Sequence, residues 1–232
     1  MSSGLRPEPV ERSELDASTA SARMMQRWAG VLPNHPEIGE DLLRRYAEPH
    51  RRYHTAQHLA DVLARIDELA SGAEDLFLVR LAAWFHDAVY AVPAGQVSNE
   101  EASARLAIRT LGRAGLEQED LTQVARLVRL TETHVPGTRD PEGELLCDAD
   151  LAILAAEPAA YDRYVAQIRE EYARVPEEEF LAGRLRILTG LADRELFRTG
   201  KGRRLTGAAR TNLEREMQAL IERLGPVEGS FP

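Results

Sequence analysis

Apolar residues recur along most of this chain at helical spacing, but one stretch is apolar on every side. Residues 76–85 are apolar except for Arg80 and contain neither proline nor glycine. Because the run shows no alternation and is longer than a typical strand, it predicts a buried helix over residues 75–90. We expect this helix to lie at the centre of the fold.

The remaining segments predict amphipathic helices, and none has the alternating pattern of a half-buried strand. In one of them, Leu59, Val62 and Ile66 fall on a single stripe at helical spacing. Prolines and glycines separate the segments. The predicted helices cover residues 19–31, 37–47, the stripe at 59–69, a segment opening at Ser98, and residues 120–134, 144–156, 159–173, 177–198 and 207–224. The pattern therefore predicts an all-α fold.

Length and polarity indicate the limits of the domain. The chain has 232 residues, of which 44% are hydrophobic, which is enough for the core of one domain. Residues 1–17 are polar, include two prolines and are expected to form a flexible tail. A single helical domain is expected over residues 18–225, followed by a short C-terminal tail at 226–232.

Two side chains that can bind a metal, His86 and Asp87, end the buried run. Leaving such groups without a partner in the interior costs roughly 2–7 kcal/mol for a neutral polar group alone. A hydrogen bond to a neighbour or a bound cation would each remove this cost. The pair by itself leaves both interpretations open.

Two further histidines, His54 and His58, lie four residues apart beside the 59–69 stripe. Side chains at this spacing share one face of a helix and can point at a common spot. His58 falls at the edge of the apolar stripe, and His54 lies one turn further toward the polar side. Each could equally be a hydrogen-bonded residue at the boundary of the core.

Other candidate residues stand at predicted helix ends. Ser98 and Glu101 have the spacing of a capping box, in which Glu101 reaches back to the cap, whereas Glu100 is either a solvated acid or an active-site group. His134 falls at the end of the predicted 120–134 helix. A histidine is common there for structural reasons as well, because it interacts favourably with the negative end of the helix dipole. Arg203 belongs to the basic segment 199–204, which is either a solvated turn or a phosphate-binding loop.

The segment around Asp148 and Asp150 offers two carboxylates, and a helical wheel separates them. At about 100° per residue, Asp150 is centred between Leu146 and Leu154 on the face that must be buried. Asp148 falls about 160° away, on the side expected to face water. Because a bare buried carboxylate is strongly disfavoured, Asp150 is the one that calls for a cation.

Charge and cysteine content narrow the functional classes. A net charge of −9 gives no general attraction to nucleic-acid polymers or to anionic membrane surfaces, so an anionic substrate would need a local positive feature such as a metal ion. A single cysteine, Cys147, excludes an intrachain disulfide and fits a reducing cytosol. No apolar run reaches about 18 residues. We therefore expect a soluble, cytoplasmic protein.

The order of these residues resembles the HD-domain superfamily of metal-dependent phosphohydrolases. Residues 53–59, Tyr-His-Thr-Ala-Gln-His-Leu, resemble its first motif, residues 84–87, Trp-Phe-His-Asp, its second, and residues 147–151, Cys-Asp-Ala-Asp-Leu, its last. The motifs lie within residues 49–154. The chain looks closest to bacterial members described only as predicted metal-dependent phosphohydrolases.

The resemblance implies an HD-domain helical bundle in which His58, His86, Asp87 and Asp150 hold a divalent cation. Mixed imidazole and carboxylate ligands suit Mn²⁺, Fe²⁺, Co²⁺, Ni²⁺ or Zn²⁺, and suit Mg²⁺ less well. The implied reaction is hydrolysis of a phosphate ester of a small molecule such as a nucleotide by metal-activated water.

The resemblance also implies roles for residues beyond the four ligands. His54 occupies the position of the proton donor in the cyclic-nucleotide phosphodiesterase branch. The chain lacks the extra His or Glu that better-known branches carry soon after the His-Asp pair. Glu100 or Glu101 could stand in for it, with Glu100 the candidate catalytic group. His134 is a candidate for binding substrate, as is Arg203 from the basic segment. His134 is also a candidate extra metal ligand.

Two rival functions stay open at this stage. One is a non-catalytic sensor that binds a metal or a nucleotide, and the other is a di-iron oxygenase, which would need additional ligands. The sequence also leaves open whether the chain forms a homo-oligomer.

Overall fold

The computed structural model describes residues 9–72 and 75–225, with side chains described from residue 18 onward. The predicted tail segments 1–8 and 226–232 lie outside the described residues. Within these ranges every regular element is helical and there is no strand, so the all-α prediction is confirmed. The elements are α1 (Pro9–Ala29), α2 (Pro36–Tyr46), α3 (Ala56–Leu69), α4 (Phe77–Phe85), α5 (Asn99–Arg113), α6 (Gln118–Leu130), α7 (Pro141–Asp150), the 3₁₀ helix η1 (Leu151–Ala155), α8 (Pro158–Glu171), α9 (Glu177–Ala192), the 3₁₀ helix η2 (Gly202–Leu205) and α10 (Thr206–Leu224).

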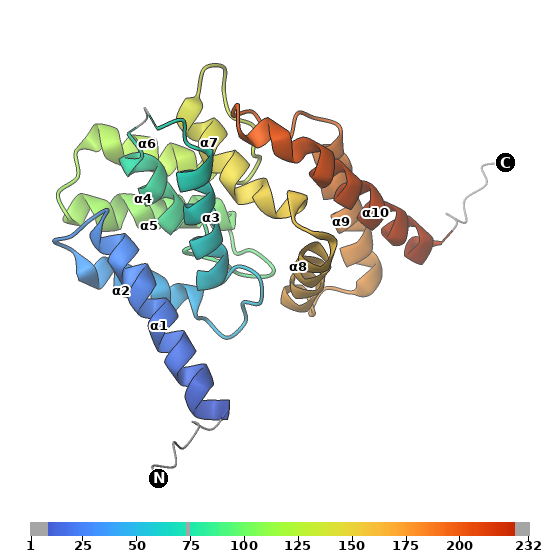
Figure 1. Cartoon of the computed structure of the whole chain (residues 1–232), viewed down its shortest axis with the longest axis horizontal. Coiled ribbons are helices and arrows are strands. Elements are labelled where there is room, and N and C mark those ends of the chain that lie inside the picture. The colour runs from blue at the N-terminus through green and yellow to red at the C-terminus, as the bar shows by residue number, and fades with distance from the viewer. Residues whose placement is uncertain (1–8, 73–74, 226–232) are drawn as a thin grey trace, which may run out of the picture.

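The helices form two groups, each with its own apolar core (Figure 1). The first core is built by α1 to α7, with Trp28 packed edge-on against Trp84 at 5.1 Å between ring centroids. The second is built by η1 and α8 to α10, around Tyr161 and Phe197. Helix α7 belongs to the first group and runs directly into η1 of the second. The end of α7 therefore lies where the two groups meet.

The central helix α4 is buried as predicted, but it ends at Phe85 instead of continuing to residue 90. The buried guanidinium group of Arg51 donates to the backbone carbonyls of Asp87 (2.7 Å) and Ala88 (3.5 Å). The N–H of Ala91, which would return to Asp87 in a continued helix, donates instead to Asn99 Oδ1 at 3.1 Å. These contacts place His86 and Asp87 in a turn after the helix.

Four other helix limits differ from the sequence prediction. Helix α1 begins at Pro9, so part of the expected tail is helical. Helix α6 ends at Leu130, and His134 has a φ of 52°, which no α-helical residue adopts. The predicted helix over 144–156 is α7 followed by η1, and α9 ends at Ala192 before residue 198.

The side chain of Asp148 is only 1% exposed, so its predicted position on the water-facing side is wrong. Its carboxylate accepts hydrogen bonds from the backbone N–H of Arg198 (2.9 Å) and from the N–H (2.8 Å) and hydroxyl (2.7 Å) of Thr199. Burial raises the pKa of Asp148, which these hydrogen bonds only partly offset. The helical wheel placed Asp148 correctly opposite Asp150, but the chain after α9 covers that second face.

In the basic segment 199–204, considered from the sequence as a solvated turn or a phosphate-binding loop, Thr199 binds a carboxylate of the protein. The N–H of Thr199 binds Asp148, and a Cβ atom on Gly202 would collide with the Asp148 carboxylate. Arg203, the proposed substrate contact, keeps 60% of its side chain exposed and pairs with Glu195. The anion held by this segment is therefore a carboxylate of the protein itself.

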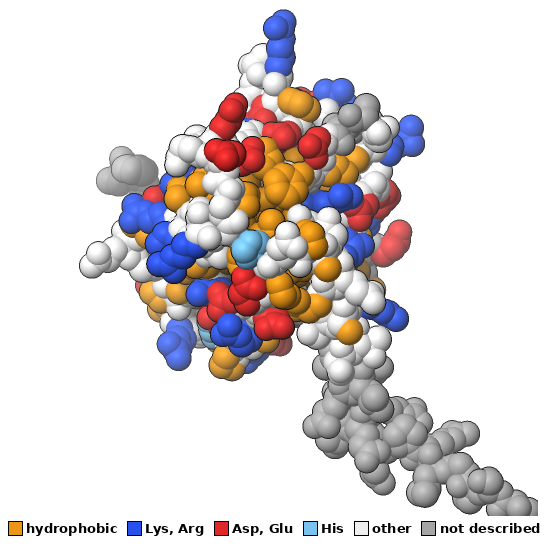
Figure 2. Space-filling view, turned by 90° about the vertical axis from the view of Figure 1, so that its left-hand side faces the viewer, with side chains coloured by type: hydrophobic (Ala, Val, Ile, Leu, Met, Phe, Trp, Pro, Cys, Tyr) orange, Lys and Arg blue, Asp and Glu red, His pale blue; other side chains and the backbone are white. Residues whose placement is uncertain are grey.

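The surface away from α8, α9 and α10 carries acidic and basic side chains interspersed with apolar ones (Figure 2). No extended area of one charge covers this face among the residues described there. Among residues 9–72 and 75–225, no helix combines the length and apolar character needed to cross a membrane.

Candidate metal centre

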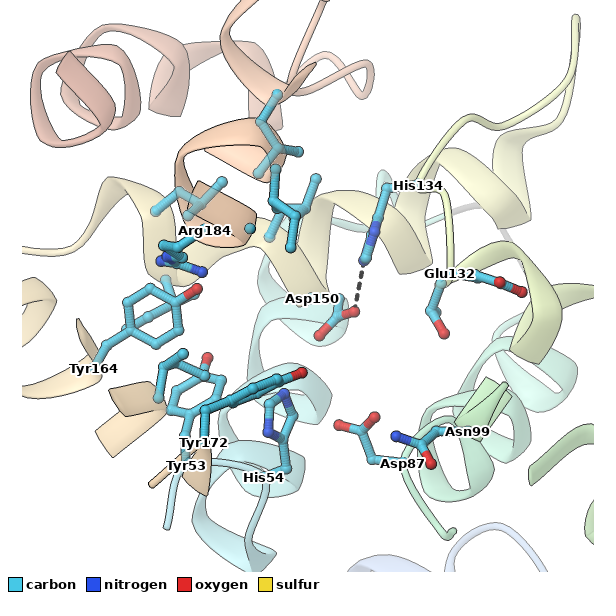
Figure 3. A pocket seen from close by; sticks show the side chains of 18 of the residues that line it. Tyr53, His54, Asp87, Asn99, Glu132, His134, Asp150, Tyr164, Tyr172 and Arg184 are labelled. Atoms are coloured by element: carbon cyan, nitrogen blue, oxygen red, sulfur yellow. Dashed lines mark hydrogen bonds and ion pairs between the residues drawn. The ribbon is translucent and has the colours of Figure 1, made fainter. Parts of the chain in front are cut away.

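Four potential metal ligands converge from three separate segments, and Figure 3 shows the carboxylates of two of them, Asp87 and Asp150, at the same cavity. His58 lies in the first turn of α3, where Thr55 caps the helix by accepting the N–H of Gln57. His86 and Asp87 occupy the turn after α4, and Asp150 is the last residue of α7. The three segments pack against one another in the first helical group, so their ends share one side of the core.

The donor atoms of these residues lie close together. His86 Nε2 is 3.0 Å from Asp87 Oδ2 and 3.6 Å from Asp150 Oδ1. His58 Nε2 is 3.1 Å from His86 Nε2, 3.1 Å from Asp150 Oδ1 and 3.4 Å from Asp87 Oδ2. Ligands about 2.1 Å from a transition metal are separated by roughly 3.0–3.4 Å in octahedral or tetrahedral sites. The spacing of the donor atoms therefore fits a divalent cation.

The surrounding contacts orient His86 as a ligand. Its Nδ1 lies 2.7 Å from the backbone carbonyl of Ala83, which can only accept, so Nδ1 carries the proton. Burial acts to lower the pKa of His86, but Asp87 raises it well above the ordinary value, so in the metal-free cluster the ring carries a proton on Nε2 that a cation would replace. Metal-binding histidines commonly donate their second nitrogen to a carbonyl or carboxylate in this way.

Charge is balanced within the cluster in a buried setting. Burial acts to raise the pKa of Asp87 and of Asp150, but His86 holds both values well below the usual range. Burial likewise acts to lower the pKa of His58, yet hydrogen bonds with Asp150 and Asp87 raise it to about 9. Two carboxylates in the interior thus depend on positive charge, which protons or a cation can supply. A buried cluster containing His58, His86 and Asp87 could hold a metal ion.

His134 contacts the cluster directly, although it lies beyond the end of α6. Its Nε2 is 2.8 Å from Asp150 Oδ2, on the oxygen that does not face His58. The left-handed backbone at His134 turns the side chain toward α7. His134 therefore either supports Asp150 or supplies a further ligand.

A cavity of about 590 Å³ opens over the cluster, between the two helical groups. Its wall includes His58, Asp87 and Asp150, together with His54 and Glu100. A volume of this size falls in the range of sites for small molecules, roughly 300–1,000 Å³. The cluster is thus accessible to a ligand larger than inorganic phosphate.

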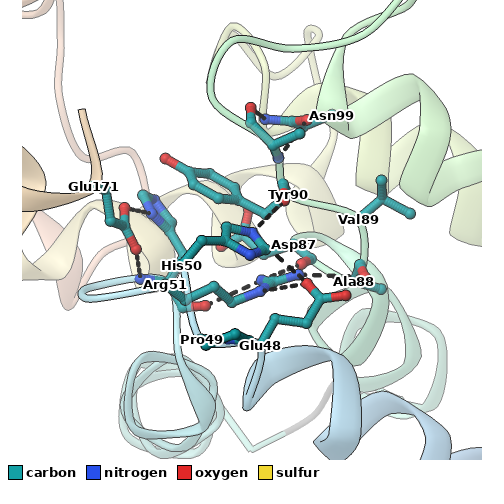
Figure 4. Close-up of polar contacts among 12 residues, drawn as sticks. Glu48, Pro49, His50, Arg51, Asp87, Ala88, Val89, Tyr90, Asn99 and Glu171 are labelled. Atoms are coloured by element: carbon teal, nitrogen blue, oxygen red, sulfur yellow. Dashed lines mark hydrogen bonds and ion pairs between the residues drawn. The ribbon is translucent and has the colours of Figure 1, made fainter. Parts of the chain in front are cut away.

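His54 is fixed at the cavity wall by the carboxylate of Glu171 from α8, which Figure 4 shows beside the segment that carries His50 and Arg51. Glu171 Oε2 lies 2.6 Å from His54 Nδ1, and Glu171 Oε1 accepts the backbone N–H groups of residues 52, 53 and 54 at 2.7–2.9 Å. Tyr90 stacks on the His54 ring at 4.1 Å between centroids. Burial acts to raise the pKa of Glu171, but the hydrogen bonds from His54 and the backbone lower it to about 2.

The two adjacent acids at the start of α5 have different surroundings. Glu100 lines the cavity, and burial raises its pKa, with a further contribution from Asp87. Ser98 accepts the N–H of Glu101 at 3.2 Å, as the capping box predicts. The Glu101 side chain does not complete the box, because it pairs with Arg105 and Arg129.

Sequence reasoning missed several residues that shape this site. Arg51 and Glu171 were not singled out, and neither were Arg184 and Arg194 of the cavity wall. Glu171 stands in a polar stretch of α8 beside Glu170, and only the packing of α8 onto the 52–54 loop separates their roles. No local pattern carried that signal.

Comparison of the chain with family models, with curated proteins and with solved structures finds no match.

Proposed function

We propose that this chain is a metal-dependent phosphohydrolase that hydrolyses a phosphate ester of a small molecule such as a nucleotide. The convergence of His58, His86, Asp87 and Asp150 at the base of one cavity carries the proposal. The sequence resemblance to HD-domain phosphohydrolases supports the same reaction class.

The donor set suits Mn²⁺, Fe²⁺, Co²⁺, Ni²⁺ or Zn²⁺, with Mg²⁺ as a weaker fit. A cation bound by these four residues would lower the pKa of a water molecule and neutralise charge on a phosphoryl group. Asp87 and Asp150 supply two negative charges. A divalent cation would balance both of them while the histidines stay unprotonated. The carbonyl of Ala83 keeps the His86 ring in the tautomer that binds a metal.

His54 is proposed to donate a proton to the leaving oxygen of the substrate. Glu171 binds Nδ1 of the ring, so Nε2 is the nitrogen left for the cavity. Histidine suits this role because its ordinary pKa lies near neutrality. The three backbone N–H groups on Glu171 hold that carboxylate in place, and the carboxylate in turn fixes the imidazole plane.

Glu100 and His134 are proposed to assist as two further groups of the cavity wall. Glu100 lines the cavity, and burial together with Asp87 raises the pKa of this carboxyl group, which favours a role in proton transfer. His134 bonds Asp150 and can also contact a substrate oxygen from the cavity wall. Arg203 is not part of the proposal, because it lies on the surface with Glu195.

The experiment combines metal analysis with hydrolysis by the purified chain. The native protein should contain a divalent metal and hydrolyse members of a nucleotide and phosphate-ester panel, with activity lost on chelation and restored by metal. Asp150→Asn should lose both metal and activity. Metal-loaded native protein that binds nucleotides without hydrolysing any panel member would support the non-catalytic sensor instead.

The contact between His134 and Asp150 favours a second candidate, a di-iron oxygenase. That interpretation requires more ligands than four, and His134 and Glu100 are additional donors on the cavity wall. Metal analysis separates the two functions, because two iron atoms per chain would favour the oxygenase.

A further inference from the structure

The cavity extends from the metal-ligand cluster to helix α9, and one face of that helix forms its far wall. The residues on this face recur every three or four positions: Phe180, Gly183, Ile187, Gly190 and Arg194, the last just beyond the helix end. This spacing places side chains one above another along a helix. The wall therefore continues well beyond the groups that would act on a phosphoryl group.

Two glycines on this face are not explained by packing. A Cβ atom at Gly183 or at Gly190 would meet no atom within 4 Å. A glycine inside a helix is less favourable than an alanine at the same position. Between them, Ile187 is 58% exposed, which is unusual for a large apolar side chain beside a cavity. The face thus offers an apolar surface with room above it.

The same wall carries positive charge that has no carboxylate partner in the described part of the chain. Arg194 donates to the backbone carbonyl of Thr133 at 2.6 Å and forms no ion pair there. Arg186 is exposed at the wall and forms none either. Arg184, in contrast, is neutralised by Glu216 at 2.8 Å and lies beside Tyr164 (Figure 3). Glu132 and Glu179 line the same cavity, but neither forms an ion pair with Arg194, so an anion there would meet a partly buried guanidinium group without a carboxylate in direct contact.

We propose that the cavity face of α9 binds the part of the substrate that is not hydrolysed, and that this part is an apolar or planar body carrying a second anionic group. The body lies over Gly183, Ile187 and Gly190, and Arg194 with Arg186 binds the anion. This inference rests on the proposed phosphohydrolase function. It narrows the substrate class to phosphate esters with a second phosphate or carboxylate group.

The first test compares three ligands that share one body. Adenosine 5′-monophosphate has a single phosphate, adenosine 3′,5′-bisphosphate adds a second, and N6-succinyl-adenosine 5′-monophosphate adds carboxylates. Titration calorimetry with their phosphonate analogues, in which a methylene group replaces each ester oxygen, avoids hydrolysis of the metal-loaded protein. At least one doubly anionic ligand should bind about tenfold or more tightly than the monophosphate analogue, and the better one identifies the second anion.

The matched variants are Arg194→Gln and Arg210→Gln, which remove the same charge from the cavity wall and from an exposed site on α10. Arg194→Gln should reduce the preference for the second anion to within about twofold, whereas Arg210→Gln should retain it. Equal affinity of the native protein for all three analogues, no binding of any of them, or a preference that survives Arg194→Gln would overturn the proposal.

The second test fills the space above α9. Gly190→Leu should weaken binding of the preferred analogue about tenfold or more without lowering the melting temperature, since nothing lies within 4 Å of an added Cβ. Gly207→Leu on α10 is the control, because its Cβ also meets nothing and it does not line the cavity. Normal binding by Gly190→Leu would overturn the proposal, and a changed oligomeric state with normal binding would assign this face to self-association.

These binding tests can fail independently of the proposed function. Native protein that hydrolyses phosphate esters but shows no preference for a second anion would refute only the inference about α9. Native protein without any metal-dependent hydrolysis would refute the function itself.

Discussion

The carboxylate of Glu171 is the most informative single group to change, because it joins α8 to the loop that carries His54. It accepts three backbone N–H groups and the His54 ring, and its side chain is almost completely buried. Glu171→Gln preserves the shape of the side chain but removes the charge. The amide can still accept through one oxygen, so the variant tests the charge more than the packing.

The size of the effect follows from the pKa of the group. The pKa of Glu171 is lowered from 4.5 to about 2 in the folded protein. A shift of this size corresponds to roughly 3 kcal/mol of stability. Because the folded-state pKa is depressed, this contribution is fully present above about pH 4.5 and is lost as the pH falls toward 2. The difference in unfolding free energy between native and variant protein should therefore be about 3 kcal/mol at pH 7 and about 1.5 kcal/mol at pH 3.

Urea denaturation between pH 7 and pH 3 measures this difference. Glu170→Gln is the matched control, because the neighbouring carboxylate is 62% exposed and lies 3.6 Å from Arg52, so its loss should change stability by less than about 0.5 kcal/mol. A difference for Glu171→Gln that stays constant over the whole pH range would refute the argument. So would a Glu170→Gln variant as unstable as Glu171→Gln.

The remaining predictions concern the ligands and their neighbours. His54→Asn should keep the bound metal but lower turnover by roughly 10²–10⁴-fold, measured by metal analysis and steady-state kinetics; loss of metal would show that His54 is a ligand. Asp148→Asn should lower the free energy of unfolding by about 1–3 kcal/mol, because the substitution weakens the hydrogen bonds to Thr199. Its metal content should stay near normal, and a metal-free but fully stable variant would contradict this. Chelation should lower the melting temperature, since a cation at a hundredfold excess over its dissociation constant adds about 2.7 kcal/mol; an unchanged melting temperature in verified metal-free protein would argue against a cation joining these segments.

The periodicity of the sequence determined the secondary structure class and the central helix. The apolar run ending at Phe85, broken only by Arg80, predicted a buried helix, and most of α4 is buried, whereas Phe77, Leu78 and Arg80 stay partly exposed. The helical wheel centred Asp150 beside Leu146 on the face expected to be buried, and in the structure its carboxylate contacts His58 and His134 while 13% of the side chain stays exposed. Convergence of the four candidate ligands was implied by resemblance, and their separations of 3.0–3.6 Å agree with it.

Only the tertiary structure decided which polar side chains become buried on the face of a helix that points away from its own core. Asp148 faces away from Asp150, yet the chain after α9 covers it, and a helical wheel contains no information about a segment some fifty residues later. The end of α4 depends in the same way on Arg51, which comes from another part of the chain and binds the carbonyl of Asp87. The partner of His54 is Glu171 and not Glu170, because only the packing of α8 brings one of two adjacent carboxylates within hydrogen-bonding distance. Local periodicity determines which face of a helix packs against the core, whereas contacts between distant segments determine which polar side chains are buried away from solvent.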